Sequence, residues 1–358
     1  MMIKYIVIGY GWRADFYMQA ARKMPDRFCV TARVVRTESR AKELSCKGEN
    51  ATTDLNEALK SECDFAVLCV PRSEVKKYLN ILAKKQIPIL CETPPGENVN
   101  DLNALWKLAN ENSMKIQVAE QYIFWPFYSA IKNIINRGII GETQSIMISA
   151  VHDYHAMNLV RKFLDIGFET CKIQGASFPT SLVKTESREG FDYSGEIISA
   201  QRDIALIEFS NGKTAIYDFN GEQYNSVIRT RRINIQGIRG EINDFTVRFL
   251  NDRNEGIESE IRRKDIGVMG NSGWSHYGMQ FGEDFVYKSP YPGIRINDDE
   301  IAVAVCLEKM KIYVDSGTEF SSLRDALQDT YLSFVMQECM KGRKSVTTTR
   351  SEERRVGK

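Results

Sequence analysis

The segment Ile3–Ala14, IKYIVIGYGWRA, constrains the fold of this chain more than any other segment. Its apolar run Tyr5–Ile8 predicts a buried parallel strand, which stops at Gly9 directly before a stretch with helical character. A strand, a glycine turn and a helix are the parts of a dinucleotide-binding unit, in which the first glycine makes the tight turn. The second glycine, Gly11, would let the backbone approach a pyrophosphate that rests on the helix N-terminus.

The turn therefore predicts a dinucleotide site at the start of the chain. Ala14 fills the third small position of the G-x-G-x-x-A pattern. The expected cofactor contacts within the turn are Gly9, Tyr10, Gly11, Trp12, Arg13 and Ala14. The alternative is a tight turn of a doubly wound sheet that binds nothing, because this motif alone is a weak signal.

The chain of 358 residues is long enough for two domains. Its 48 basic and 47 acidic residues balance, so we expect a small-molecule partner rather than nucleic acid or an anionic membrane. No apolar run reaches the roughly 20 residues of a membrane span, and no signal peptide is recognisable, so we expect a cytoplasmic protein. The eight cysteines show no spacing typical of zinc, so we expect reduced thiols and no metal.

Strand-like and helix-like segments alternate from Phe28 to Tyr122. Apolar strands are predicted at 28–35, 64–71, 87–91 and 115–118, with helices between them. Units of this length imply a parallel sheet, and such sheets bind ligands outside the carboxyl ends of their strands. The residues predicted to lie at that edge are Gly9, Val35–Thr37, Val70–Arg72, Glu92–Pro95 and Glu120–Tyr122.

The end of the second predicted strand bears on the choice of cofactor. An Asp or Glu near this point binds the ribose diol of NAD, whereas an Arg suits the 2′-phosphate of NADP. Here the strand ends in Val35, Arg36 and Thr37, without a carboxylate. Since Arg36 offers a planar cation, we expect NADP(H), with NAD possible, bound by Arg36 and Thr37. The alternative is that Arg36 is only a solvated charge at a strand end.

Several motifs follow one another in a particular order. They are the early glycine turn, Val70-Pro71, Cys91-Glu92-Thr93-Pro94, Glu120-Gln121-Tyr122 with Trp125-Pro126 after it, and Gly138-Ile139-Ile140-Gly141-Glu142. In order and spacing they resemble the Gfo/Idh/MocA family of nicotinamide-dependent oxidoreductases. The resemblance implies an α/β protein in three parts. These are an N-terminal Rossmann domain at 1–122, a C-terminal α/β domain with an open, mainly antiparallel sheet at 123–346, and a tail at 347–358. It also implies a sugar-like or polyol substrate and a homo-oligomer formed through that sheet.

The resemblance further implies which residues border the nicotinamide, namely Val70, Pro71, Glu92, Thr93 and Gln121. The family's Glu-Lys-Pro motif falls on residues 92–94, so Thr93 stands where a substrate-orienting lysine is usual. A threonine hydroxyl can donate and accept a hydrogen bond, but it does not titrate near neutral pH and carries no charge. Gln121 likewise replaces the usual asparagine.

A predicted strand at 143–151 leads into His152-Asp153-Tyr154-His155, the densest group of potential proton carriers in the sequence. These residues begin a predicted helix on which His155 and Lys162 share one face and Met157 lies on the opposite face. We expect the apolar face to pack on the sheet and the other face to border a cleft. A metal site made of His152, Asp153 and His155 is the alternative, but this ligand set is too small.

The family carries an Asp-x-x-x-His pattern at the start of this helix, which supplies its active-site histidine. His155 matches that histidine, whereas Val151 and Asn158 occupy the positions of the usual acids. The resemblance therefore implies that His155 is the proton carrier, with Tyr154 or Lys162 as substitutes. The alternative is a hydrogen-bonded histidine with a structural role at the helix N-terminus.

The rest of the second domain is predicted to be rich in strands. Asn211-Gly212 between two alternating runs indicates a β-hairpin. Long strands are expected at 227–237 and 240–249, His276 in a loop, and amphipathic helices at 301–315 and 322–341.

The sequence as a whole predicts an NADP(H)-preferring oxidoreductase that transfers a hydride between nicotinamide and a sugar-like, polyol or keto substrate. Thr93 leaves two alternatives open. One is a nucleotide-binding sensor or scaffold without dehydrogenase turnover. The other is a redox-neutral hydrolase or lyase that uses bound NAD transiently.

Overall fold

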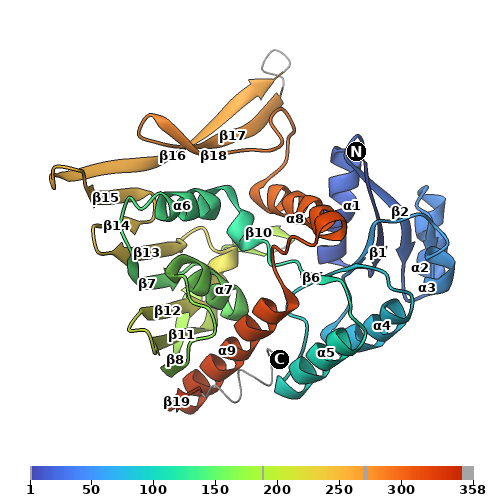
Figure 1. Cartoon of the computed structure of the whole chain (residues 1–358), viewed down its shortest axis with the longest axis horizontal. Helices are drawn as coiled ribbons and strands as arrows, with labels where there is room; N and C mark the ends of the chain where they lie inside the picture. The colour runs from blue at the N-terminus through green and yellow to red at the C-terminus, as the bar shows by residue number, and fades with distance from the viewer. Residues whose placement is uncertain (1, 188, 269–272, 349–358) are drawn as a thin grey trace.

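The computed structural model describes residues 2–187, 189–268 and 273–348, which form two large sheets with helices packed on them (Figure 1). The N-terminal sheet has the order β3-β2-β1-β4-β5-β6, and every neighbouring pair is parallel. Its strands are β1 (Ile3–Ile8), β2 (Phe28–Val34), β3 (Ala51–Thr52), β4 (Phe65–Leu68), β5 (Ile89–Cys91) and β6 (Ile116–Val118). This is the strand order of a dinucleotide-binding Rossmann domain, whose ligands lie where the order reverses beside β1.

The helices of this domain are α1 (Trp12–Lys23), α2 (Glu38–Cys46), α3 (Leu55–Ala58), α4 (Arg72–Lys84) and α5 (Val99–Glu111). Thr37, Asp54 and Asn98 each accept a backbone N–H as N-caps of α2, α3 and α5, which explains why these helices begin where they do. The N-cap of α4 is Pro71, so this helix begins directly after the strand–proline turn.

The second sheet has the order β18-β17-β16-β15-β14-β13-β7-β12-β11-β8-β19. The pair β7 and β12 is parallel and the other neighbours are antiparallel, so the predicted α/β fold class is confirmed. Its strands are β7 (Thr143–Ser149), β8 (Cys171–Val183), β11 (Ile197–Phe209), β12 (Thr214–Asn220), β13 (Arg232–Gly237), β14 (Gly240–Asn243), β15 (Thr246–Leu250), β16 (Gly256–Val268), β17 (Gly273–Phe281), β18 (Asp284–Lys288) and β19 (Ser345–Thr347). A separate hairpin pairs β9 (Glu186–Ser187) with β10 (Gly190–Phe191).

The remaining helical elements connect or cover the sheets. They are η1 (Tyr122–Phe124), α6 (Pro126–Asn136), α7 (Asp153–Leu164), η2 (Gly221–Asn225), α8 (Asp298–Ser316) and α9 (Leu323–Gly342). The boundary predicted between residues 122 and 123 falls within η1. In the described part of the chain, no helix combines the length and the apolar character needed to cross a membrane.

Three local predictions in the second domain were wrong. The strand expected at 227–237 begins only at Arg232, and the one expected at 240–249 is the hairpin of β14 and β15. His276, expected in a loop, lies buried within β17. The arm of β16 and β17 was missed because many of its side chains are charged and exposed, so the apolar alternation that marks a strand is weak.

The helix α8 returns from the end of the chain to cover the Rossmann domain. Figure 1 shows α8 beside α1, and apolar residues of α8 share one buried cluster with β1 and α1. Lys23 Nζ lies 2.5 Å from Glu300 Oε1, and Arg27 Nη1 lies 2.8 Å from Glu308 Oε1. These two ion pairs lie at the C-terminal end of α1 and just before β2, and they hold α8 against the Rossmann domain.

Candidate active site

The glycine turn has the backbone geometry that a pyrophosphate site requires. Gly9 has φ +136°, and a Cβ there would lie 2.0 Å from the carbonyl oxygen of Cys69, so no larger residue fits. Gly11 has φ +153°, and a Cβ there would meet nothing within 4 Å. Gly11 is also the N-cap of α1 and provides no side-chain cap, which leaves the first N–H groups of α1 for an anion. These residues fit a dinucleotide.

Arg33 supports this turn from within the protein. Its side chain is only 2% exposed, and its guanidinium lies 3.2 Å from Asp15 and 3.1 Å from Glu49. Its Nε also donates to the carbonyl oxygen of Gly9 over 3.3 Å. Sequence reasoning missed this role, although a single arginine inside an apolar strand was a visible signal.

The predicted adenosine contacts lie exposed beyond the end of β2. Arg36 and Thr37 are exposed, and Thr37 Oγ1 accepts the backbone N–H of Arg40 over 3.4 Å. The Arg40 guanidinium lies 4.3 Å from the ring centroid of Tyr10, a residue of the glycine turn. Arg40 is therefore a second cation beside the predicted ribose site, and sequence reasoning did not single it out.

Glu92, which follows β5, is the centre of a cluster of buried polar side chains. It accepts hydrogen bonds from Arg13 Nε over 3.0 Å, from the Tyr17 hydroxyl over 2.5 Å and from the Thr93 N–H over 3.1 Å. Burial and the neighbouring Glu92 charge raise the pKa of Tyr17 well above its ordinary value. Arg13, which sequence analysis placed on the cofactor, thus uses its Nε to hold Glu92, while its Nη1 has no hydrogen-bond partner among the described residues.

Gln121 borders the same edge of the sheet. It is buried, and its side-chain oxygen Oε1 has no hydrogen-bond partner among the residues that the structure describes. A buried acceptor without a donor is costly unless a ligand supplies the donor. The carboxamide of a nicotinamide ring has suitable N–H groups, so this orphaned atom also fits the cofactor. Val70 and Pro71, two other residues predicted at this edge, lie between the end of β4 and the start of α4.

The helix α7 brings His155 to the carboxyl end of β6. His155 Nδ1 lies 2.6 Å from Glu120 Oε2, and the two residues are 5% and 4% exposed. The Tyr122 N–H donates to the other carboxylate oxygen over 3.4 Å. Burial raises the pKa of Glu120 to about 8, and burial together with the Arg13 charge lowers the pKa of His155 to about 3. Burial is the largest cause of both shifts, since it favours the neutral form of each group.

Other proton carriers surround His155. The ring centroids of Tyr154 and His152 lie 4.2 and 5.0 Å from that of His155. The Tyr224 hydroxyl is 2.7 Å from His152 Nδ1, and burial lowers the pKa of His152 to about 4. Burial raises the pKa of Tyr154, an effect that a hydrogen bond with the Thr93 side chain opposes. Thr93, in place of the usual lysine, is thus in contact with the predicted substitute proton carrier.

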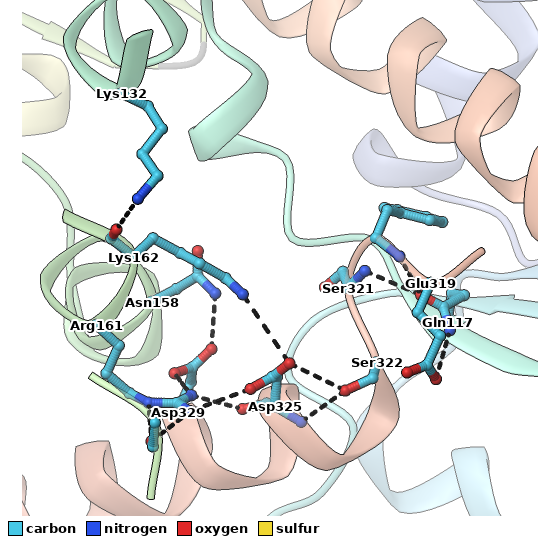
Figure 2. A network of polar contacts seen from close by, with 12 residues as sticks. Gln117, Lys132, Asn158, Arg161, Lys162, Glu319, Ser321, Ser322, Asp325 and Asp329 are labelled. Atoms are coloured by element: carbon cyan, nitrogen blue, oxygen red, sulfur yellow. Dashed lines mark hydrogen bonds and ion pairs between the residues drawn. The ribbon is translucent and has the colours of Figure 1, made fainter. Parts of the chain in front are cut away.

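A buried ion-pair network fixes the position of α7 (Figure 2). Arg161 Nη1 lies 2.5 Å from Asp329 and Arg161 Nη2 lies 3.0 Å from Asp325, both on α9. Asn158 donates to Asp329 over 2.7 Å, and Lys162 Nζ is 3.9 Å from Asp325. Asn158 and Lys162 therefore contact α9. Because α7 is covered by α9 as well as by the sheet, the open cleft expected beside its polar face is replaced by this network.

An aromatic cavity of about 210 Å³ lies near this cluster. Its lining includes Trp125, Phe127, Tyr128, Arg231 and Phe245. The Tyr122 ring connects the cavity to the proton carriers, since its centroid lies 5.2 Å from that of Trp125 and 4.6 Å from that of His155. The described residues contain no group of three or more His, Cys, Asp or Glu side chains that could hold a metal ion.

The fold and the glycine turn together define a dinucleotide-binding protein of the Rossmann class. Residues 3–120 match the model of an oxidoreductase family with an NAD-binding Rossmann fold, GFO_IDH_MocA. The Rossmann domain thus matches the Gfo/Idh/MocA oxidoreductase family, which is the family that the order of motifs resembles.

A curated relative is similar over part of the chain. It is the scyllo-inositol 2-dehydrogenase (NADP(+)) IolU of Bacillus subtilis (strain 168), 26% identical over 139 residues. The match spans 38% of this chain and 42% of the length of that relative.

Solved structures are similar over nearly the whole chain. An NAD-binding oxidoreductase from Klebsiella pneumoniae has a TM-score of 0.67 at 14% identity, with 98% of this chain and 100% of that chain covered. An oxidoreductase from Agrobacterium radiobacter, in complex with NAD+, L-tartaric acid and magnesium, has a TM-score of 0.66 at 17% identity over 97% and 98% of the chains. At these identities the likeness shows a shared fold.

Proposed function

We propose that this protein is an NADP(H)-preferring oxidoreductase that transfers a hydride between nicotinamide and a carbinol or keto carbon of a sugar-like substrate. One observation carries the proposal. His155, from the second domain, is hydrogen-bonded to Glu120 at the carboxyl end of β6, the edge of the Rossmann sheet where a dinucleotide binds. A proton carrier and a cofactor site at one edge are the two parts that carbonyl reduction or alcohol oxidation needs.

The nicotinamide cofactor supplies the hydride chemistry when it is bound. Gly9, Gly11 and the N-terminus of α1 would hold the pyrophosphate, and the Gln121 oxygen would orient the carboxamide. His155 would hold or release the proton at the substrate oxygen, in contact with Tyr154.

The substrate class rests on the aromatic cavity that the Tyr122 ring links to His155. Sugars and polyols present C–H faces that pack on aromatic rings and hydroxyls that pair with a few polar groups. Trp125 and Phe127 supply such rings, and Arg231 supplies a donor at the cavity wall. The curated relative from Bacillus subtilis is named as a dehydrogenase of an inositol with NADP(+), which agrees with this class.

Binding and turnover tests separate the proposal from its rivals. The protein is titrated with NADPH and NADH by fluorescence and then offered a panel of keto sugars and polyols. Oxidation or reduction of panel members supports the oxidoreductase. Binding without turnover across the panel supports the sensor or scaffold, which the loss of the lysine at Thr93 favours. Cofactor retained through purification would support the redox-neutral hydrolase or lyase.

Replacing Arg36 with alanine should weaken NADPH binding about 10- to 100-fold and change NADH binding by less than about 2-fold. The reason is that a charge-assisted hydrogen bond to the 2′-phosphate contributes about 1.5–3 kcal/mol. The dissociation constants are measured by fluorescence titration, with Arg253→Ala, an exposed arginine in the β15–β16 turn, as the control. Equal losses of affinity for NADPH and NADH would refute the proposed preference for NADP(H).

Replacing His155 with alanine should lower kcat about 100-fold or more while leaving NADPH affinity within a few fold, because only the proton carrier is removed. Steady-state kinetics and a fluorescence titration measure the two effects. His152→Gln is the companion variant, since His152 is the other histidine of the cluster. A large loss for His152→Gln with a small loss for His155→Ala would transfer the role to His152.

A further inference from the structure

Glu120 and His155 form a buried pair between the two domains that the resemblance does not supply. The family pattern points to positions 151 and 158 for an acid, and these hold valine and asparagine here. The acid that contacts His155 comes instead from the segment after β6, with Oε2 2.6 Å from Nδ1. Nδ1 is therefore engaged, and Nε2 is the ring nitrogen left for a substrate oxygen.

We propose that Glu120 is the proton partner of His155: it gives a proton to Nδ1 or takes one from it, while Nε2 exchanges a proton with the substrate oxygen. The inference rests on the proposed function of His155. Glu120 acts through the imidazole and not on the substrate, so it is a positioning and proton-holding residue. The principle is that of an acid that fixes the tautomer of a catalytic histidine.

The proton steps balance in both directions. In reduction the carbonyl carbon receives the hydride, its oxygen takes the Nε2 proton, and Nδ1 takes the Glu120 proton. The products are the alcohol, the oxidised cofactor, a neutral imidazole with hydrogen on Nδ1, and a Glu120 carboxylate. Oxidation reverses each transfer, with the alcohol proton passing to Nε2 and the Nδ1 proton returning to Glu120.

The surroundings of the pair determine its charge state. Arg13 from α1 and Glu92 after β5 influence both members, Arg13 by lowering and Glu92 by raising each pKa. Asp299 from α8 and Asp329 from α9 raise the pKa of His155. Further titratable neighbours are Tyr122 of η1, and His152 and Tyr154 of α7.

The net result is a pair that prefers neutral forms. Burial raises the pKa of Glu120 to about 8, so below that pH the carboxylic acid donates to Nδ1 and Nε2 carries hydrogen. Above that pH the carboxylate accepts from Nδ1–H, and Nε2 presents a lone pair. Reduction should therefore be favoured below about pH 8, and oxidation should reach its plateau above it.

The tautomer of His155 can be observed in the cofactor-free protein. Nitrogen-15 NMR of the imidazoles between pH 6 and 10 should show hydrogen on Nε2 at low pH and on Nδ1 at high pH, with a midpoint near 8. The resonance is assigned as the one lost in His155→Gln. Titration of His155 to imidazolium near the ordinary value of about 6.5, or one tautomer throughout, would overturn the inference.

The Glu120→Gln variant tests the partner directly. Its amide donates to Nδ1 but has no proton to give up, so His155 should keep hydrogen on Nε2 at every pH. We expect kcat to fall about 100-fold and its pH dependence near 8 to disappear, with NADPH affinity unchanged within about 2-fold. Glu111→Gln, an exposed glutamate at the end of α5, is the matched control.

The outcomes distinguish this inference from the proposed function. An unchanged pH profile in Glu120→Gln would overturn the role of Glu120 while leaving the oxidoreductase intact. Absence of turnover in the unmodified protein would count against the proposed function, and the wild-type NMR titration would still decide whether Glu120 sets the tautomer. That titration does not use the Glu120→Gln variant, so it still tests the role of Glu120 if this variant does not fold.

Discussion

Replacing Gly9 with alanine should both destabilise the protein and abolish tight dinucleotide binding. A methyl group at this position would lie 2.0 Å from the Cys69 carbonyl oxygen, on a backbone with φ +136° that L-residues rarely adopt. Overpacking and backbone strain each cost about 1–3 kcal/mol, so the free energy of unfolding should fall by about 2–6 kcal/mol. The turn must also move to relieve the contact, which displaces Gly11 from the pyrophosphate.

Urea denaturation and NADPH titration measure the two effects of Gly9→Ala. Gly256→Ala is the control, because a Cβ at Gly256, at the start of β16, would meet nothing within 4 Å. The control should leave stability within about 0.5 kcal/mol and NADPH affinity unchanged. If Gly9→Ala had the stability of the wild type, the backbone at Gly9 could not lie so close to the Cys69 carbonyl oxygen.

Replacing Arg161 with methionine should cost about 3–5 kcal/mol of unfolding free energy, the usual cost of breaking a buried ion pair. Arg161 is 3% exposed and lies between Asp325 and Asp329, so its removal leaves the buried Asp329 carboxylate without a cation (Figure 2). Because the network holds α7 against α9, the position of His155 should also become less defined, with a lower kcat.

The cost of Arg161→Met should depend on pH. Burial already raises the pKa of Asp329 while Arg161 opposes that shift, so loss of Arg161 should raise the pKa further. The deficit should be complete above the folded-state pKa of Asp329 in the variant. It should shrink as the pH falls through that raised pKa, because a neutral Asp329 no longer needs a cation.

Urea denaturation at pH 7 and pH 4 measures this dependence. Arg137→Met, at the exposed pair with Asp284, should cost less than about 1 kcal/mol. Equal costs at the two arginines would contradict the view that burial of the network decides its contribution.

Local pattern was sufficient for most of the Rossmann domain. Each strand–helix unit carries its own signals, such as the apolar run before Gly9 and the apolar strands that alternate with helices from Phe28 to Val118. These signals act over a few residues, so they can be recognised in a sequence without knowledge of the fold. The order of motifs then predicted the family, which the family model confirmed over residues 3–120.

The arm of β16 and β17 and the return of α8 to α1 were not predictable in this way. The strands of the arm are exposed, so burial imposes little alternation on their side chains. The helix α8 is separated from α1 by most of the chain, and its pairing depends on complementary packing and on ion pairs such as Lys23–Glu300. The buried residues of α8 include the consecutive run 300–304, so periodicity does not show which surface this helix covers.

The glycine turn was predicted from residues adjacent in sequence, because turn chemistry is local, and the resemblance to the family singled out His155 as the candidate proton carrier. Which acid serves that histidine was decided only by tertiary structure. The positions on its own helix hold Val151, which is apolar, and Asn158, which donates to Asp329. Glu120 reaches His155 across 35 positions of sequence because the docking of α7 brings the helix start to the carboxyl end of β6.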